Sequence, residues 1–285
     1  MIVLRGESSL PPEQSIQAKK PTWGFFCLYA IISPMASWSQ KRKLLYGGIT
    51  VVVLAAAIFL PAFFYFYKAP TCFDGIKNGD ETGIDCGGSC QRLCQSAFLA
   101  PSVSWTRIEQ VAPSLYNIAT YIVNPNNKAV AMNVPYHVII YDKDGVEITE
   151  YDGNVTLPPQ RNTLAFNGAV SMGKRVPAKA LFEFTSAPNW ISAADPLSNI
   201  TIGDKKYSED SSGASLSVTL NDHSAQTTSR TDVYAVLYDK DGNAIGFSKT
   251  ILDGIPAYGS ATAPFTWPTS FNGAVISIEV LPVAE

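Results

Sequence analysis

The stretch NVPYHVIIYDKDGVEI at residues 133–148 recurs 97 residues later as RTDVYAVLYDKDGNAI at residues 230–245. The two copies align without a gap from Tyr116 to Pro159. Each copy contains short apolar stretches that alternate with polar residues and are separated by turn residues, a pattern typical of half-buried strands. Because neither copy has helical periodicity, the repeat predicts two tandem antiparallel β-sandwiches.

The tetrapeptide Asp-Lys-Asp-Gly stands in both copies directly after an apolar stretch. It predicts a hairpin turn in which the glycine takes a positive φ. The alternative is a set of calcium ligands, but this tetrapeptide at a hairpin is more typical of a turn. The aspartates concerned are Asp142, Asp144, Asp239 and Asp241.

A strand-like motif that ends in Tyr-Asp marks each copy, VIIYD at 138–142 and AVLYD at 235–239. Each motif is followed by Lys-Asp-Gly and later by a turn proline. These residues resemble the FxLYD-type immunoglobulin-like domains of bacterial and archaeal envelope proteins, although Val138 and Ala235 replace the leading aromatic residue of that pattern. The resemblance implies an extracytoplasmic immunoglobulin-like sandwich and names no ligand.

Upstream of the repeats, a run of 24 uncharged residues extends from Leu44 to Tyr67. As a helix it is roughly 36 Å long, enough to cross a hydrocarbon core of about 30 Å. A core helix of a soluble domain would keep a polar stripe, which this run lacks. The run ends in FFYFY, which is typical of an aromatic belt at the level of the headgroups. We therefore predict one transmembrane helix at 44–67, with the lipid bilayer as its partner.

Charge predicts the orientation of this helix. A Lys-Arg-Lys triplet at 41–43 precedes it, so we expect residues 1–43 in the cytoplasm and the rest of the chain outside. A cleaved signal peptide with small residues at 55–57 is the alternative, but the apolar run continues well beyond them. Residues 69–285 carry 14 basic and 22 acidic groups, which argues against nucleic acid as a partner.

The N-terminal 34 residues contain an apolar segment at 23–34 that is too short to span a membrane. We hypothesise that translation starts at Met35, which gives the leader MASWSQKRKLLYGG, typical of a signal anchor. The alternative start is Met1. The intact mass of the purified protein distinguishes the two.

Four of the five cysteines follow the apolar run closely, at Cys72, Cys86, Cys90 and Cys94, while Cys27 precedes it. An even number clustered on the translocated side predicts two disulfides, with three possible pairings. A zinc site is the alternative, but the spacings do not form Cys-x₂-Cys pairs and the compartment is expected to be oxidising. We define residues 68–96 as the cysteine module.

The segment CFDGIKNGDETGIDCGGSC resembles the short cysteine-rich DGIxNGxExxxDCGGxC module of modular secreted and surface proteins, which implies no common activity. Its oxygen-bearing side chains also suggest calcium as the one cofactor to consider. The alternative is that these residues serve turns, since the EF-hand template does not fit. The calcium candidates are Asp74, Asn78, Asp80, Glu81 and Asp85.

The sequence offers little catalytic chemistry. No nucleophile elbow, zinc-protease helix, phosphate-binding loop or dinucleotide-binding glycine pattern occurs in it. The two histidines, His137 and His223, are not duplicated between the repeats. We therefore expect neither an enzyme nor a small-molecule substrate. Four aromatic residues near strand ends are candidates for recognition or, more simply, plugs of the sandwich ends: Trp105, Trp190, Tyr258 and Trp267.

These features together predict a mostly β protein with one transmembrane helix, a disulfide-rich module, and sandwiches at 97–194 and 195–285. The expected function is non-catalytic binding or scaffolding at a cell envelope, with an envelope or surface protein or a glycan as partner. One alternative is an accessory subunit of a secretion, pilus or transport complex. Another is an envelope enzyme whose carboxylates meet only in the fold.

Overall fold

The computed structural model describes residues 37–67 and 69–285. The chain divides into two compact units, Met1–Ala69 and Pro70–Glu285. The expectations for residues 1–36, including the alternative starts, Cys27 and most of the cytoplasmic segment, lie outside the described residues.

The described part of the first unit contains one helix, α1, from Trp38 to Phe66. It begins after Ser37, whose backbone N–H donates a hydrogen bond of 3.1 Å to Oε1 of Gln40. None of its residues is buried against protein. Among the described residues α1 is the one helix long and apolar enough to cross a membrane. This finding fits a membrane anchor, and the orientation stays a prediction.

The second unit begins with the cysteine module and a short 3₁₀ helix, η1, at Gln95–Ala97. The first sandwich follows, with sheet orders β1-β2-β5 and β4-β3-β6, and β7 beside β3. All of these pairings are antiparallel. The strands are β1 Ser102–Ala112, β2 Leu115–Val123, β3 Ala129–Asp142, β4 Glu147–Leu157, β5 Thr163–Ser171, β6 Pro177–Phe184 and β7 Ile191–Ser192.

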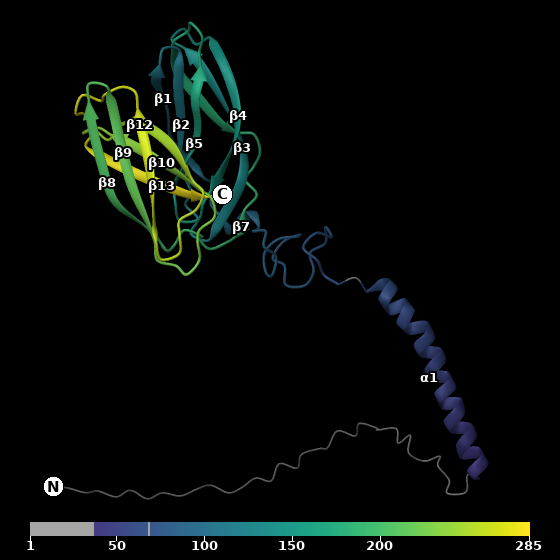
Figure 1. The fold of residues 1–285 in the computed structure, drawn as a ribbon. Helices are drawn as coiled ribbons and strands as arrows, with labels where there is room; N and C mark the ends of the chain where they lie inside the picture. The colour runs from purple at the N-terminus through teal and green to yellow at the C-terminus, as the bar shows by residue number, and fades with distance from the viewer. Residues whose placement is uncertain (1–36, 68) are drawn as a thin grey trace, which may run out of the picture. The chain divides into compact units, whose positions relative to one another are not determined.

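The second sandwich repeats this topology, with sheet orders β8-β9-β12 and β11-β10-β13. Each sandwich encloses its own apolar core. The predicted mostly β fold, with two antiparallel sandwiches, is thereby confirmed (Figure 1). The strands are β8 Ile200–Asp210, β9 Gly213–Asp222, β10 Thr231–Tyr238, β11 Ala244–Leu252, β12 Ser260–Trp267 and β13 Ser277–Ala284.

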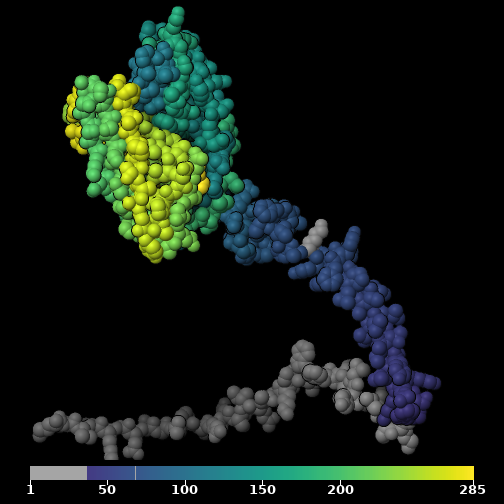
Figure 2. Space-filling view, viewed as in Figure 1, coloured from purple at the N-terminus to yellow at the C-terminus, as the bar shows by residue number. Residues whose placement is uncertain are grey.

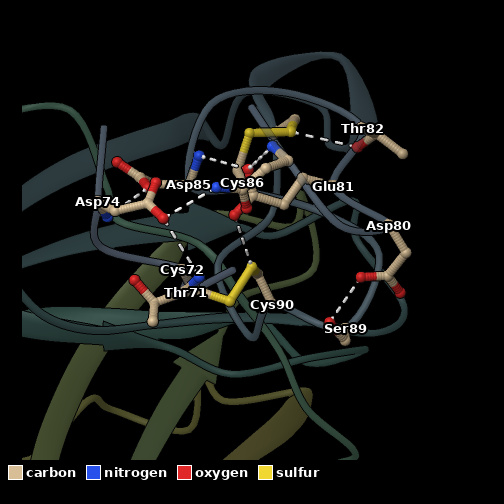
Figure 3. Close-up of a disulfide and its surroundings, with 12 residues drawn as sticks. Thr71, Cys72, Asp74, Asp80, Glu81, Thr82, Asp85, Cys86, Ser89 and Cys90 are labelled. Atoms are coloured by element: carbon tan, nitrogen blue, oxygen red, sulfur yellow. Dashed lines mark hydrogen bonds between the residues drawn. A yellow bond between two sulfur atoms is a disulfide. The ribbon is translucent and has the colours of Figure 1, made fainter. Parts of the chain in front are cut away.

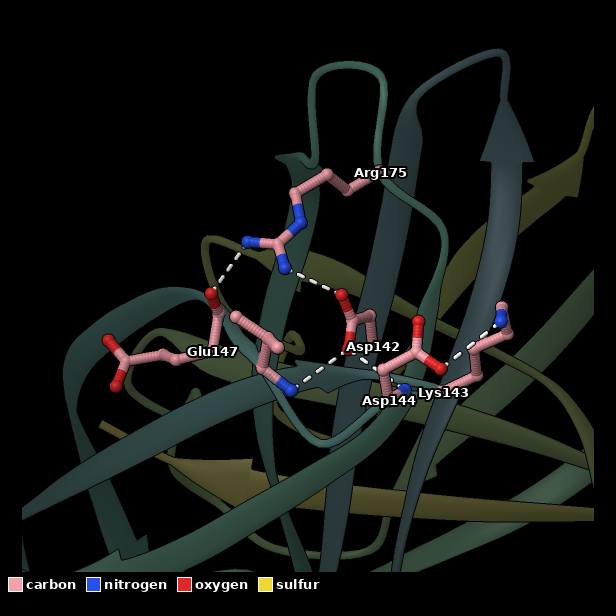
Figure 4. A network of polar contacts seen from close by, with 6 residues as sticks. Asp142, Lys143, Asp144, Glu147 and Arg175 are labelled. Carbon is pink, nitrogen blue, oxygen red and sulfur yellow. Dashed lines mark hydrogen bonds and ion pairs between the residues drawn. The ribbon is translucent and has the colours of Figure 1, made fainter.

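The Asp-Lys-Asp-Gly segments form the expected hairpin turns. Oδ1 of Asp142 accepts hydrogen bonds from the N–H groups of Asp144 and Val146, at 3.0 and 2.9 Å. Gly145 closes the turn at φ +76°, which a glycine adopts without strain. Figure 4 shows Arg175 reaching the same turn, where its guanidinium pairs with Asp142 and donates to the Glu147 carbonyl. A side-chain cation thus occupies one side of this carboxylate.

The gapless alignment is wrong by one residue in the first strand pair. Tyr121 pairs with Leu164 and Thr219 pairs with Thr262, so β2 matches β9 at a spacing of 98 residues instead of 97. Side chains on a strand alternate between faces, so the gapless alignment superposes residues that face opposite ways. Strand β3 matches β10 at the expected 97, since His137 pairs with Asp152 as Tyr234 pairs with Lys249.

A third apolar core joins the two sandwiches. It lies between the sheet β1-β2-β5 and the sheet β11-β10-β13, each of which therefore buries both faces. In β2, Ile118 and Ile122 point into the first sandwich, while Ala119 and Tyr121 belong to the shared core. Figure 2 shows the teal surface of the first sandwich meeting the green-to-yellow surface of the second along a continuous boundary. The tandem domains are thus one packed body.

Candidate binding cleft

The cysteine module is stapled by the disulfides Cys72–Cys90 and Cys86–Cys94 (Figure 3). This confirms the prediction of two disulfides and selects one of the three pairings. The module also docks on the first sandwich, because the Leu93 N–H donates to the Trp190 carbonyl at 2.9 Å.

The carboxylates proposed as calcium ligands serve as hydrogen-bond acceptors inside the module. Asp85 accepts from the N–H groups of Asp74 and Gly75, at 3.0 and 3.1 Å. Asp80 accepts from the Ser89 hydroxyl at 2.7 Å on the other side of the module (Figure 3).

Asp74 and Glu81 are held in the same way. Asn78 donates its side-chain amide to Asp74 at 2.9 Å, and this bond is the main reason that the pKa of Asp74 is lowered. Glu81 accepts from the backbone N–H of Asn78 and of Asp85 at 3.3 Å. In the described part of the chain, the only close group of three metal-ligand side chains joins Glu81 to the sulfurs of one disulfide. Calcium binding stays a prediction.

The other residues singled out from the sequence lie apart from one another. Trp190 and Trp267 are buried within the cores of the two sandwiches. Trp105 packs in the shared core, and Tyr258 is exposed. His137 lies on the outer sheet of the first sandwich, and its hydrogen bond with Asp152, 2.8 Å long, is the main cause that raises its pKa.

A hollow lies where the two sandwiches meet. This interdomain cleft has a volume of about 450 Å³. Strands β3, β4 and β5 supply one wall. Strands β10 and β11, the end of β13 and the residue Glu285 supply the other. Its lining residues are Met132, Asn133, Asn154, Val155, Thr156, Leu164, Phe166, Asp232, Tyr234, Lys249, Val283, Ala284 and Glu285.

A β-bulge shapes the first wall of the cleft. The pairing of β3 with β4 shifts between Ala131 and Val134, so Met132 and Asn133 stand opposite the single residue Thr156. Asn133 has φ +51°, in the left-handed region that costs a non-glycine residue energy. Bulges commonly turn side chains toward binding sites, and here both bulge residues line the cleft.

The second wall holds a buried charge, since only 10% of the Asp232 side chain is exposed. Its Oδ2 pairs with the Lys249 ammonium group and accepts a bond of 3.3 Å from the Tyr234 hydroxyl. Its Oδ1 is buried and has no hydrogen-bond partner within the described residues. Burial, together with the Asp232 carboxylate, raises the pKa of Tyr234. A buried acceptor without a hydrogen bond costs free energy, so a ligand hydroxyl or amine that donated a hydrogen bond to Oδ1 would bind favourably.

An apolar groove of about 290 Å³ adjoins the interdomain cleft. The two hollows share Met132, Thr156, Ala284 and Glu285, so they form a continuous surface. Beyond the shared residues, the groove is lined largely by aliphatic side chains and prolines, including Pro158, Pro159 and Pro196. The whole surface therefore offers polar contacts at one end and apolar contacts at the other.

Polar contacts hold the two sandwiches together. Phe247 of β11 donates its backbone N–H to Glu109 of β1 at 3.1 Å. Arg161 donates to the Asp195 carboxylate and, at 2.6 Å, to the Leu197 carbonyl in the segment that joins the sandwiches. Leu197 is fully buried, so this connecting segment is packed into the body. The cleft is therefore preformed.

Sequence reasoning did not find this cleft, although one signal was available. Strand β10, TDVYAVLY, is apolar at almost every position and is buried on both faces. Continuous apolar strands indicate burial on both sides, whereas a sandwich that stands alone exposes one face of each sheet. The pair Asp232 and Lys249 has no counterpart in the first repeat, where Pro135 and Asp152 occupy those places.

No family model and no curated protein matches this chain. Among solved structures it is similar to a β-glucuronidase from glycoside hydrolase family 2, with 11% sequence identity and a TM-score of 0.22. That match covers 77% of this chain but 29% of the glucuronidase, so the chain spans less than a third of its length. It is also similar to the N-terminal CBM22-1-CBM22-2 tandem domain of Paenibacillus barcinonensis Xyn10C, with 10% identity and a TM-score of 0.13. That match covers 65% of this chain and 86% of the tandem domain, and at such scores neither likeness bears on function.

Proposed function

We propose that this chain is a signal-anchored envelope protein that binds a surface or envelope partner in the interdomain cleft and performs no catalysis. Residues 44–67 would span the membrane, with the N-terminal side in the cytoplasm. The apolar helix and the disulfide-bonded module support this topology, because disulfides persist in oxidising compartments outside the cytoplasm. The VIIYD and AVLYD motifs support membership of the FxLYD-type immunoglobulin-like family.

The observation that carries the binding proposal is the preformed cleft with an unpaired carboxylate oxygen in its wall. Rigid sites between domains are common places for ligands, since little ordering is required when the ligand binds. The carboxylates in and beside the cleft are paired with cations, Asp232 with Lys249 and Glu285 with Arg230. Paired carboxylates of this kind suit recognition of hydroxyl or amide groups better than acid–base catalysis.

Topology is tested first. Protease added to intact cells should remove the C-terminal two-thirds of the chain and leave the helix with its N-terminal segment protected. Full protection of the sandwiches in intact cells, with digestion after lysis, would overturn the proposed orientation.

Binding in the cleft is tested by filling it. Met132 and Val146 are both 53% exposed, and only Met132 lines the cleft. Tagged full-length protein with Met132→Trp should recover its envelope partner at least about tenfold less well than the native chain, since a tenfold loss corresponds to about 1.4 kcal/mol of binding. The matched variant Val146→Trp should recover it normally. Equal recovery by the two variants would place the binding surface elsewhere.

A further inference from the structure

Three large apolar side chains on the cysteine module are exposed to solvent. Phe73 is 92% exposed, Ile76 62% and Ile84 61%. We call these residues the exposed trio. The module is otherwise polar and rich in glycine, and it makes its contact with the first sandwich through later residues such as Leu93. The trio therefore has no cover within the described part of the chain.

Hydrogen bonds tie the segment of Phe73 and Ile76 to the segment of Ile84. The Asp85 carboxylate, next to Ile84, accepts hydrogen bonds from the N–H groups of Asp74 and Gly75, which lie between Phe73 and Ile76. The disulfide of Cys72 fixes the residue before Phe73. A stapled loop presents apolar groups at a low cost in conformational entropy.

The length of chain after α1 limits where the trio can lie. Six residues lie between Phe66, the last residue of the helix, and Phe73, so seven Cα–Cα steps join the two. Even fully extended, they span roughly 25 Å. The headgroup layer adds about 5–8 Å to each side of the hydrocarbon core. Such a short tether keeps the trio within reach of the layer at a high effective concentration, so even weak lipid contact is populated.

The charge of the module selects the kind of lipid contact. Residues 68–96 carry four acidic groups and three basic groups, a net charge of −1, so attraction to anionic lipid does not favour binding. Apolar and aromatic groups next to a membrane instead favour insertion at the boundary between headgroups and acyl chains.

From these observations we propose that the exposed trio inserts into the outer headgroup layer beside the transmembrane helix. The cysteine module would then contact the membrane directly. This proposal rests on the proposed membrane anchor. It adds a second lipid-binding surface, formed by Phe73, Ile76 and Ile84.

Photo-crosslinking of the full-length chain in phosphatidylcholine vesicles tests lipid contact by the exposed trio and by the membrane anchor separately. The photoreactive residue p-benzoylphenylalanine replaces one of three exposed aromatic residues: Phe64 in α1, Phe73 in the trio, or Tyr258, which is 75% exposed on the second sandwich. The readout is the yield of lipid adduct by intact mass. Each variant must retain both disulfides, which is checked by mass after alkylation without reduction.

We expect lipid adducts at positions 64 and 73, with the yield at 73 at least about tenfold above that at 258, given the effective concentration that the tether imposes. The yield at 73 should not rise when anionic phosphatidylglycerol is added. Adducts at 64 with none at 73 would contradict lipid contact by the exposed trio and would still support the membrane anchor. Absence of adducts at 64 contradicts the anchor, and protein adducts alone at 73 show that the trio binds another chain.

Discussion

The Glu279 carboxylate, on the second sandwich, accepts a hydrogen bond of 2.8 Å from the Tyr121 hydroxyl, on the first. Tyr238 donates a second bond of 2.8 Å to the same carboxylate, and the Asn162 side-chain amide donates to the Tyr121 oxygen. Burial, reinforced by the Glu279 carboxylate, raises the pKa of both tyrosines. This cluster is a polar clasp at the edge of the shared apolar core.

Replacing Glu279 should loosen the body. Glu279→Ala leaves two half-buried tyrosine hydroxyls without their acceptor, and we expect a loss of about 2 kcal/mol in the free energy of unfolding. Chemical denaturation of the full-length chain in detergent measures the change. Glu183→Ala, at an exposed strand position, is the control and should change stability by less than about 0.5 kcal/mol. Equal effects of the two substitutions would contradict a role for the clasp.

Glu109 should make stability depend on pH. Burial, opposed by the bond from the Phe247 N–H, raises the pKa of Glu109 from 4.5 to about 8. Between these values the unfolded chain releases a proton that the folded chain keeps, so a rising pH favours unfolding. The stabilisation is complete below pH 4.5 and is lost as the pH rises through 8.

Glu109→Gln isolates this effect, because an amide stays neutral and can still accept from Phe247. Relative to the native chain, the variant should gain about 1–3 kcal/mol of stability between pH 5 and pH 8.5. Denaturation midpoints at the two pH values give the comparison. A constant difference between variant and native chain would show that Glu109 is charged in the folded state at both.

Arg161 should control the order of the connecting segment. Arg161→Ala removes the donors to Asp195 and to the Leu197 carbonyl, and we expect a loss of about 2 kcal/mol. Arg161→Lys keeps the positive charge but lacks the planar guanidinium that donates to both acceptors. It should therefore restore less than half of the lost stability. Thermal unfolding and protease cleavage within residues 193–199 report the effect. Full rescue by lysine would mean that charge alone suffices.

Asp85 should rigidify the loop that carries the exposed trio. In Asp85→Ala the N–H groups of Asp74 and Gly75 lose their acceptor, so the Gly75 amide should exchange with deuterium about tenfold faster, given the energy of a single cap. Asp80→Ala is the matched control, because its carboxylate bonds to Ser89 on the other side of the module. Unchanged exchange at Gly75 in the Asp85 variant would refute this role.

The sequence predicted what depends on local pattern. The turn at Asp142, the four linked cysteines, the long apolar helix and the sandwich fold all follow from spacing and composition. The pairing of Cys72 with Cys90 did not, because three pairings satisfy the same spacing. Calcium binding and the orientation of the membrane helix remain predictions.

The shared core and its cleft depend on which face of each sheet is apolar, and a one-residue error in the repeat alignment hides that. Once strands are matched by their pairing partners, the differences between the copies mark the interface. Exposed Glu150 of the first copy becomes buried Phe247 in the second, and buried Leu164 becomes exposed Thr262.

Contact between unlike faces of two related domains has a consequence for assembly. The sheet β1-β2-β5 of one copy meets β11-β10-β13 of the other, so the arrangement runs head to tail and does not close on itself. Stacking of this kind, if continued, would grow into a fibre. The two terminal faces are polar instead, with His137, Glu150 and Asp152 on one and Lys206, Ser217 and Thr219 on the other. Polar terminal faces oppose the addition of a third sandwich, so the differences between the two copies end the stack at two.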